Sequence, residues 1–212
     1  MSWIRRTLLA PFMFLAAACS YGPERTYLDL HSFVAKPHSH EFAASLEYAR
    51  IKDPRGSINT FPNGGAGKVM HREARIYRGD LDRGTVDLVV AIPDFAGIPQ
   101  PKAVRVEGWN ADALYFSLFG YGGNDRDGDD LSDERRLFYR ATADGRVQEV
   151  DALPPRLARE TSSGPDGSPP FLRWSQRHLD VEIAIDERVS GAADVAKLTF
   201  DAETGESQLS LP

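Results

Sequence analysis

A single cysteine, Cys19, occurs among the 212 residues of the chain. One thiol cannot form an internal disulfide, so the fold has to be stabilised by its hydrophobic core alone. Long apolar runs are also missing, because the run from Leu8 to Ala18 has about half of the roughly 20 residues that a membrane-spanning helix needs. We therefore expect neither a disulfide scaffold nor a permanent transmembrane helix.

Positive charge is in deficit. The chain has 25 Lys and Arg against 31 Asp and Glu, which gives a net charge of -6 and a pI near 5.4. A general nucleic-acid-binding protein needs clustered basic residues to neutralise phosphates, so we expect no nucleic-acid partner. With 42% hydrophobic and 26% charged residues, the composition is that of an ordinary globular domain.

The N-terminal segment predicts export. Arg5 and Arg6 precede the apolar run, three alanines end it, and Cys19 follows directly. Basic, apolar and small residues in this order are typical of a secretory signal peptide. The segment Leu15–Cys19, LAAAC, resembles the lipobox of bacterial lipoproteins, in which signal peptidase II cleaves before a cysteine that becomes lipidated.

This resemblance implies a processed, membrane-anchored protein. Residues 1–18 would be the lipoprotein signal peptide, and residues 19–212 a single all-β extracytoplasmic domain anchored by acyl chains on Cys19. Ser20, rather than Asp, after the cysteine favours sorting to the outer membrane, with the protein facing the periplasm. The alternative is a plain signal peptide with an incidental cysteine. Loss of Arg5 and Arg6 with the leader would change the net charge from -6 to -8.

Helical periodicity is scarce beyond Cys19. Short apolar runs alternate with Gly, Pro, Asn and Asp, a pattern typical of β-strands separated by turns. The sequence therefore predicts an all-β domain, with one helical turn expected at 156–160. The clearest strands are expected at Thr85–Ile92, Ala103–Val106, Ala113–Phe119, Arg136–Thr142, Arg146–Leu153, Val181–Ile185 and Val195–Phe200.

A motif of apolar and aromatic residues followed by a turn glycine recurs about every 60 residues. Trp109 and Trp174, which are 65 positions apart, give a second set with a similar period. The pair Asp144-Gly145 predicts a hairpin turn of the primed type, since both residues tolerate a positive φ. The segment Leu137–Val147, which contains this turn, resembles the strand, turn and strand passage of β-propeller blades, and this implies four-stranded antiparallel repeats. Three repeats are visible and closed propellers have more, so an open arrangement or a β-sandwich is the alternative. The recurring motif lies at Ile76–Arg78, Leu137–Arg140 and Leu198–Phe200.

An acidic run lies between two predicted strands. Carboxylates at loop positions 1, 3, 5 and 9, with a backbone carbonyl at position 7, match the spacing that surrounds Ca²⁺ with oxygen atoms. The run resembles the calcium loops of integrin-type propellers and thrombospondin-type repeats. That resemblance implies that the side chains of Asp125, Asp127, Asp129 and Asp133 and the backbone of Leu131 bind a structural Ca²⁺. The alternative is a solvated acidic hairpin tip without a metal.

Other chemical sites have weaker signals. His38 and His40, with His31 nearby, are residues that bind zinc, but no third or fourth ligand is evident. The segment Gly64–Lys68 fails the P-loop pattern at both ends, and no Gly-x-Ser-x-Gly motif occurs. Aromatic residues follow strand alternation and are expected in the core rather than on a sugar-binding surface.

The leading functional hypothesis is a lipid-anchored binding or scaffold module of the bacterial envelope, with loops presented to a protein partner. One variant is a periplasmic immunity or inhibitor protein, for which the acidic charge favours a basic partner. The alternative is a carboxylate-based hydrolase, such as a glycoside-type enzyme, with its site in the loops. Two convergent carboxylates, or a carboxylate with a histidine, in a concave pocket would favour the hydrolase.

Overall fold

The computed structural model describes residues 21–54, 68–122, 134–161, 172–177, 180–185, 195–201 and 206–211. These residues form three antiparallel β-sheets and one 3-10 turn, η1 (Asp94–Gly97), so the prediction of an all-β chain is confirmed.

Sheet A has the spatial order β4 (Thr85–Pro93), β3 (Lys68–Asp80), β2 (Glu41–Pro54), β1 (Tyr21–Ala35) and β9 (Glu160–Thr161). Sheet B is formed by β5 (Gln100–Asn110), β6 (Ala113–Tyr121), β7 (Glu134–Ala141) and β8 (Val147–Val150). Sheet C is formed by β10 (Leu172–Arg177), β11 (Asp180–Ile185), β12 (Val195–Phe200) and β13 (Ser207–Ser210).

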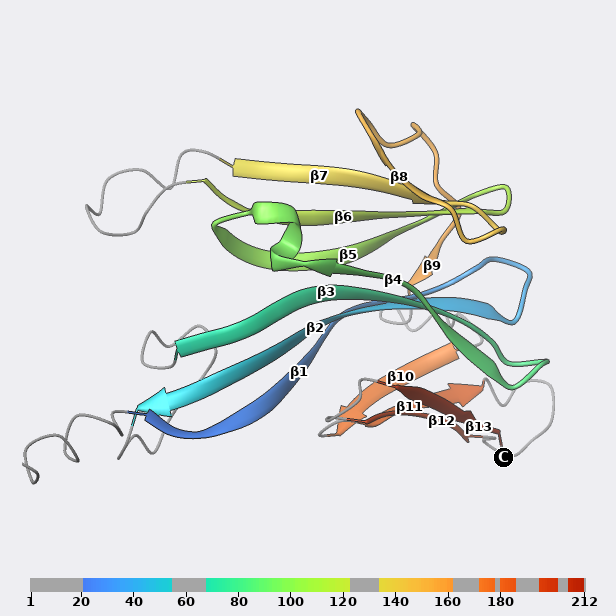
Figure 1. The fold of residues 1–212 in the computed structure, drawn as a ribbon. Helices are drawn as coiled ribbons and strands as arrows, with labels where there is room; N and C mark the ends of the chain where they lie inside the picture. The colour runs from blue at the N-terminus through green and yellow to red at the C-terminus, as the bar shows by residue number, and fades with distance from the viewer. Residues whose placement is uncertain are drawn as a thin grey trace, which may run out of the picture.

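Sheet A is the middle layer of the molecule (Figure 1). On β2, Phe42, Ala44 and Leu46 belong to the core that packs against sheet C, which includes Leu198. Ala43, between them, belongs to the second core, which packs against sheet B. Because a strand alternates its side chains between two faces, burial of both faces makes β2 apolar at consecutive positions.

Packing in the core between sheets A and C depends on a close approach to a glycine. Phe42 lies opposite Gly79 in the β2–β3 ladder, and a Cβ added to Gly79 would come within 2.1 Å of the Phe42 ring. The ring of Phe42 stacks on Phe33 at 5.0 Å between centroids. The glycine therefore provides the space in which this aromatic pair packs.

The recurring motif occupies equivalent strands. Ile76–Arg78 lies on β3, Leu137–Arg140 on β7 and Leu198–Phe200 on β12, and each of these is the third strand of a four-stranded meander. Trp109 and Trp174 lie on β5 and β10, the first strands of sheets B and C. The internal similarity therefore corresponds to a repeated unit of structure. Within the described residues, the three sheets do not close into a ring.

The β7–β8 hairpin lies where the Asp-Gly signal predicted it, but its turn differs from the expected primed type. Gly145 has φ 81°, and no positive φ occurs at Asp144. The amide of Gly145 donates a hydrogen bond to the carbonyl of Thr142 at 3.0 Å. The amide of Thr142 donates one to the carbonyl of Arg146 at 2.9 Å. This is a type I turn followed by a left-handed glycine, which is another common way to close a hairpin.

The helical turn expected at 156–160 is wrong. This segment is extended: Ala158 exchanges two backbone hydrogen bonds with Trp109, at 2.7 and 2.8 Å, and Glu160 begins β9. Pairing with the edge of β5 satisfies these peptide groups without a helix. Among the residues that the structure describes, no helix is long and apolar enough to cross a bilayer.

Candidate functional site

The site residues predicted from the sequence lie outside the described part of the chain. This holds for Cys19 and for the proposed calcium ligands Asp125, Asp127, Asp129, Leu131 and Asp133. The acidic run connects β6 to β7, which are antiparallel neighbours with Tyr121 opposite Glu134, as its predicted place between two strands requires. Within the ranges that the structure describes, no group of three or more potential ligands is arranged to hold a metal.

The histidines considered for zinc are not brought together. His31 lies on β1, where its Nδ1 accepts a hydrogen bond from the amide of Val104 at 2.9 Å. His40 lies at the β1–β2 turn with its Nδ1 2.5 Å from a carboxylate oxygen of Asp82. His38, between them in sequence, is exposed and has φ 58°. Each described imidazole therefore has a different environment, and none of them forms a shared ligand set.

A polar cluster that the sequence did not predict lies on the face of sheet A toward sheet B. His31 Nε2 is 3.6 Å from a carboxylate oxygen of Asp29 and 3.6 Å from one of Glu47. Arg72 donates from Nε to the other oxygen of Glu47 at 2.5 Å, and its guanidinium lies over the ring of Phe95, 5.0 Å from the centroid. Glu47 is 5% exposed, and its charge is compensated by Arg72, whose side chain is 18% exposed.

This cluster is continuous with the contact between sheet A and the edge strand β5. The amide of Val106 donates to Ser32 Oγ at 2.8 Å, next to the His31 contact to Val104. Ser45 donates to the carbonyl of Val104 at 2.8 Å. At Val104 and Val106, side chains of β1 and β2 thus take the place of a neighbouring strand, and they satisfy peptide groups that would otherwise be buried without partners.

The electrostatics of the cluster favour a charged Asp29 and a neutral Tyr27. The hydrogen bond from His31 holds the pKa of Asp29 below its usual value of 3.8, against the opposing effect of burial. Burial, together with the nearby charge of Asp29, raises the pKa of Tyr27 from 10.0 to about 12. A general acid needs a carboxyl group whose pKa is raised, and Asp29 is shifted in the opposite direction.

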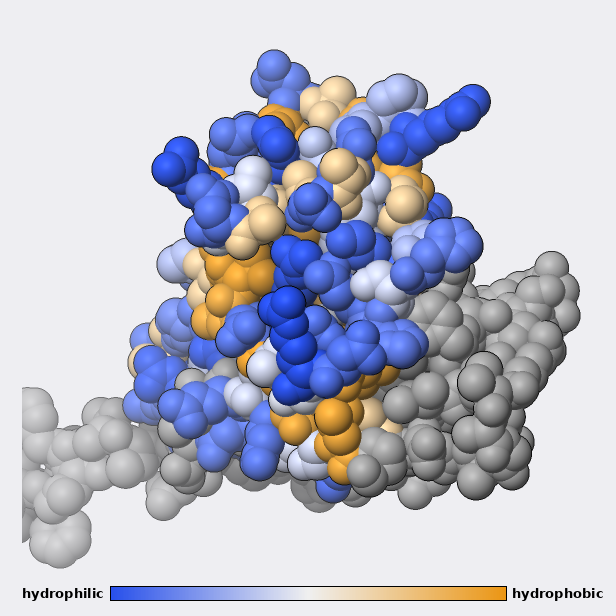
Figure 2. Space-filling view, turned by 90° about the vertical axis from the view of Figure 1, so that its right-hand side faces the viewer, coloured by the Kyte–Doolittle hydropathy of each residue, from blue (hydrophilic) through white to orange (hydrophobic). Residues whose placement is uncertain are grey.

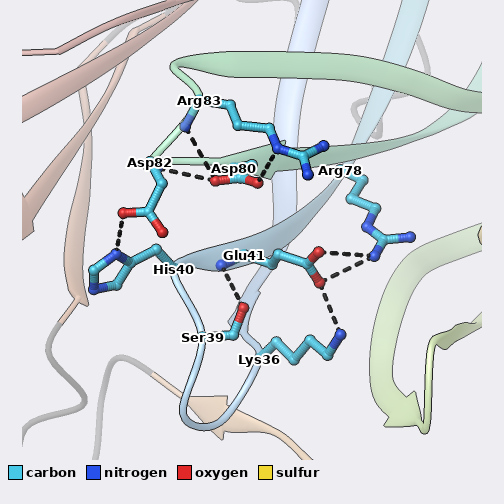
Figure 3. A network of polar contacts seen from close by, with 8 residues as sticks. All are labelled: Lys36, Ser39, His40, Glu41, Arg78, Asp80, Asp82 and Arg83. Atoms are coloured by element: carbon cyan, nitrogen blue, oxygen red, sulfur yellow. Dashed lines mark hydrogen bonds and ion pairs between the residues drawn. The ribbon is translucent and has the colours of Figure 1, made fainter.

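A second polar network joins the turns at one end of the molecule (Figure 3). Glu41 accepts hydrogen bonds from Lys36 at 2.9 Å and from Arg78 at 3.0 Å to both carboxylate oxygens. Lys36 Nζ also lies 3.4 Å from a carboxylate oxygen of Asp112, at the β5–β6 turn. The pKa of Glu41 lies below its usual value because the hydrogen bonds from Lys36 and Arg78 outweigh the effect of burial.

The β3–β4 turn is held to the β1–β2 turn within the same network. The contact between His40 and Asp82 crosses between the two turns, and the amide of Leu81 donates to the carbonyl of His40 at 3.1 Å. Asp80 accepts from the backbone amides of Asp82 and Arg83 at 2.9 and 3.2 Å. We call residues 36–41, 80–84 and 111–112 the turn face.

The turn face combines fixed inner charges with exposed outer ones. The side chains of Lys36 and Glu41 are 21% and 24% exposed, whereas those of Asp82 and Asp112 are 70% and 79% exposed. Figure 2 shows this end of the molecule as a mostly hydrophilic surface with small apolar patches. The exposed carboxylates of Asp82 and Asp112 therefore lie around a less exposed pair, Lys36 and Glu41.

Sequence reasoning missed both networks because their members are far apart in the chain. Glu47 and Arg72 are 25 positions apart, and Lys36 and Asp112 are 76 apart. For the turn face, the available signal was polar residues at the ends of strands, which is also typical of solvated turns. By contrast, the expected core role of the aromatic residues is confirmed for Trp109, Tyr115, Phe116 and Tyr139, which are at most 9% exposed.

Comparisons with known proteins give no family for this chain. No protein-family model matches it, and no curated protein matches it. Two solved structures align over most of the chain. One is a mutant of the Synechocystis apocarotenoid oxygenase, with 14% sequence identity and a TM-score of 0.27; the alignment covers 90% of this chain and 47% of that one. The other is an acylaminoacyl peptidase in complex with Z-Gly-Gly-Phe-chloromethyl ketone, with 12% sequence identity and a TM-score of 0.24; the alignment covers 89% of this chain and 33% of that one. The chain spans less than half the length of either protein, and the TM-scores are too low to assign it to either fold.

Proposed function

We propose that the protein is a lipid-anchored binding module of the bacterial envelope whose turn face contacts a protein partner. The sequence from Arg5 to Cys19 supports the anchor, since it has every part of a lipoprotein signal in order. The outer membrane, with the domain in the periplasm, is the proposed location because Ser20 follows the cysteine. Several acyl chains on one cysteine anchor a protein stably, so the proposed anchor does not require a membrane-spanning segment.

The observation that carries the binding role is the turn face itself. Three turns from two sheets are joined by ion pairs, so the exposed carboxylates of Asp82 and Asp112 are presented on an ordered surface. Surfaces ordered before binding lose less conformational entropy when a partner binds. Exposed carboxylates at the rim favour a basic partner, which is the charge expected from the net charge of -6.

The length of β1 separates this face from the anchor. β1 has 15 residues and begins two positions after Cys19, and at about 3.3 Å per residue it extends about 50 Å. The β1–β2 turn at its far end belongs to the turn face. The proposed partner would therefore be bound up to about 50 Å from the membrane surface, which is farther than the thickness of the lipid headgroup layer.

Site-specific photo-crosslinking in living cells tests the binding role. A photoreactive amino acid at Asp82 or Asp112 is expected to give a discrete crosslinked adduct with one envelope protein. The matched control is Glu134, a carboxylate with 59% side-chain exposure at the start of β7, away from the turn face. Identical adduct patterns at all three positions, or none at any, would contradict the assignment of the turn face.

Two structural details belong to the same proposal. The three meanders are proposed to be blade-like repeats, which the equivalent third strands β3, β7 and β12 support. The position of the first meander between the other two supports a layered, sandwich-like assembly of these units. A structural Ca²⁺ bound by Asp125, Asp127, Asp129, Leu131 and Asp133 is proposed from the spacing of the acidic run between β6 and β7.

A second candidate function, a carboxylate-based hydrolase, is favoured by one observation. Asp29 and Glu47 both lie 3.6 Å from His31 Nε2, which is the pairing expected of such a site. The contacts of His31, Ser45 and Arg72 to the β5 backbone support a structural role for the cluster instead. An immunity or inhibitor protein is a form of the leading proposal in which the partner is a basic periplasmic toxin.

A further inference from the structure

Two consecutive residues at the end of sheet A opposite the turn face are apolar and exposed. Val69 and Met70, at the start of β3, are 46% and 42% exposed. The other exposed large hydrophobic residues within the described ranges are Leu88 and Leu211, at 49% and 44%. Leu211 lies against Gly84 of the turn face, so it belongs to the opposite end of the molecule.

The register of sheet A brings basic residues of three strands next to this apolar pair. Glu24, Lys52 and Lys68 form one row across β1, β2 and β3, and Arg25, Ile51 and Val69 form the next. We call residues 24–25, 50–53 and 68–71 the basal end. It contains four Lys and Arg against two Asp and Glu, an excess of positive charge in a chain with a net charge of -6.

The place of the basal end in the chain restricts what can cover it. Glu24 follows Cys19 by five positions, and an extended chain spans at most about 3.6 Å per residue, so the two residues are at most about 18 Å apart. If the acyl chains on Cys19 lie in a bilayer, Glu24 near the start of β1 is held within about 18 Å of the cysteine at the bilayer surface. The paired ends of β2 and β3 are held there with it.

We propose that the basal end docks on the surface of an anionic phospholipid bilayer. Val69 and Met70 enter the interface between headgroups and acyl chains, and Arg25, Lys52 and Lys68 contact lipid phosphates. This inference rests on the proposed anchor at Cys19, and it adds a protein surface and an orientation to it. Sheet A then stands away from the membrane, with the turn face outermost (Figure 1).

Fluorescence quenching in vesicles tests the docking. The lipidated full chain is purified with Met70→Cys or Leu88→Cys, and the new thiol alone is labelled with an environment-sensitive fluorophore, since the thiol of a lipidated Cys19 is blocked. Leu88 is the matched control because it is similarly exposed but lies on β4 opposite Tyr77. Vesicles contain phosphatidylethanolamine and phosphatidylglycerol, with a nitroxide quencher placed near the headgroups.

We expect the label at position 70 to be quenched at least threefold more strongly than the label at position 88. Adding Lys68→Glu to the Met70→Cys protein should reduce this difference, because the new carboxylate repels phosphatidylglycerol. Flotation of the vesicles reports the anchor separately. Equal quenching at both positions in protein that floats overturns the docking surface and leaves the anchor intact; protein that does not float overturns both.

Discussion

At the scale of single residues, Gly108 joins β5 to the segment that follows β8. It has φ 130°, a region that side chains other than glycine rarely occupy, and a Cβ added there would lie 2.7 Å from the carbonyl oxygen of Ala158. Gly108→Ala should therefore lower the free energy of unfolding by about 2–5 kcal/mol through backbone strain and overpacking. Chemical denaturation measures the change.

Gly97→Ala is the control for that substitution. Gly97 also has a positive φ, 76°, but nothing lies within 4 Å of its added Cβ. Gly97→Ala should therefore lower the free energy of unfolding only by the cost of placing an alanine at a positive φ, about 1–2 kcal/mol. Equal effects at the two positions would show that the contact with Ala158 does not constrain Gly108.

Tyr27 gives a residue-scale prediction for alkaline pH. Its pKa is raised from 10.0 to about 12 in the folded protein, first by burial, so the folded state keeps the phenol proton where the unfolded chain loses it. The resulting stabilisation is fully present below pH 10 and is lost as the pH rises towards 12. Tyr27→Phe should flatten the loss of stability over this window and remove a phenol that ionises near pH 12 in an absorbance titration at 295 nm. An unchanged titration curve would contradict this assignment.

At the scale of secondary-structure elements, the edge of β5 depends on side chains of sheet A. Ser45 is fully buried and connects the carbonyl of Val104 at 2.8 Å with Ser32 Oγ at 2.6 Å. Ser45→Ala leaves buried hydrogen-bonding groups without this partner and should cost about 1–3 kcal/mol of unfolding free energy. Ser210→Ala, at an exposed position, should change it by less than about 0.5 kcal/mol. Similar values for the two variants would contradict the role of Ser45 at the β5 edge.

The elements differ in how far the sequence predicted them. Strands β4, β6, β7, β11 and β12 were predicted closely because alternation and turn residues bound them. β1 and β2 were missed: β2 is buried on both faces. On β1, His31 has partners on distant strands, Glu47 of β2 and Val104 of β5. The hydrogen-bond and ion-pair partners come from strands that are distant in sequence, and a local sequence pattern does not predict which strands pair.

At the scale of the whole molecule, the proposed calcium loop predicts that stability depends on Ca²⁺. Ligand at about 100 times its dissociation constant adds about 2.7 kcal/mol, so removal by EGTA should lower the Tm by roughly 5–10 °C, and added Ca²⁺ should restore it. Asp127→Ala should abolish the response, whereas Asp151→Ala, at an exposed position after β8, should retain it. A Tm that does not respond to EGTA or Ca²⁺ in the unmodified protein would exclude the metal.

The claim that connects the membrane, the orientation of sheet A and the turn face is lipidation at Cys19. Mass spectrometry of the protein extracted from cell membranes tests it most directly. The account predicts a chain that lacks residues 1–18 and carries a diacylglyceryl group and an amide-linked acyl chain on Cys19, and it predicts that Cys19→Ser abolishes labelling with palmitate. Recovery of the full chain from Met1, without lipid and in the cytosolic fraction, would contradict it.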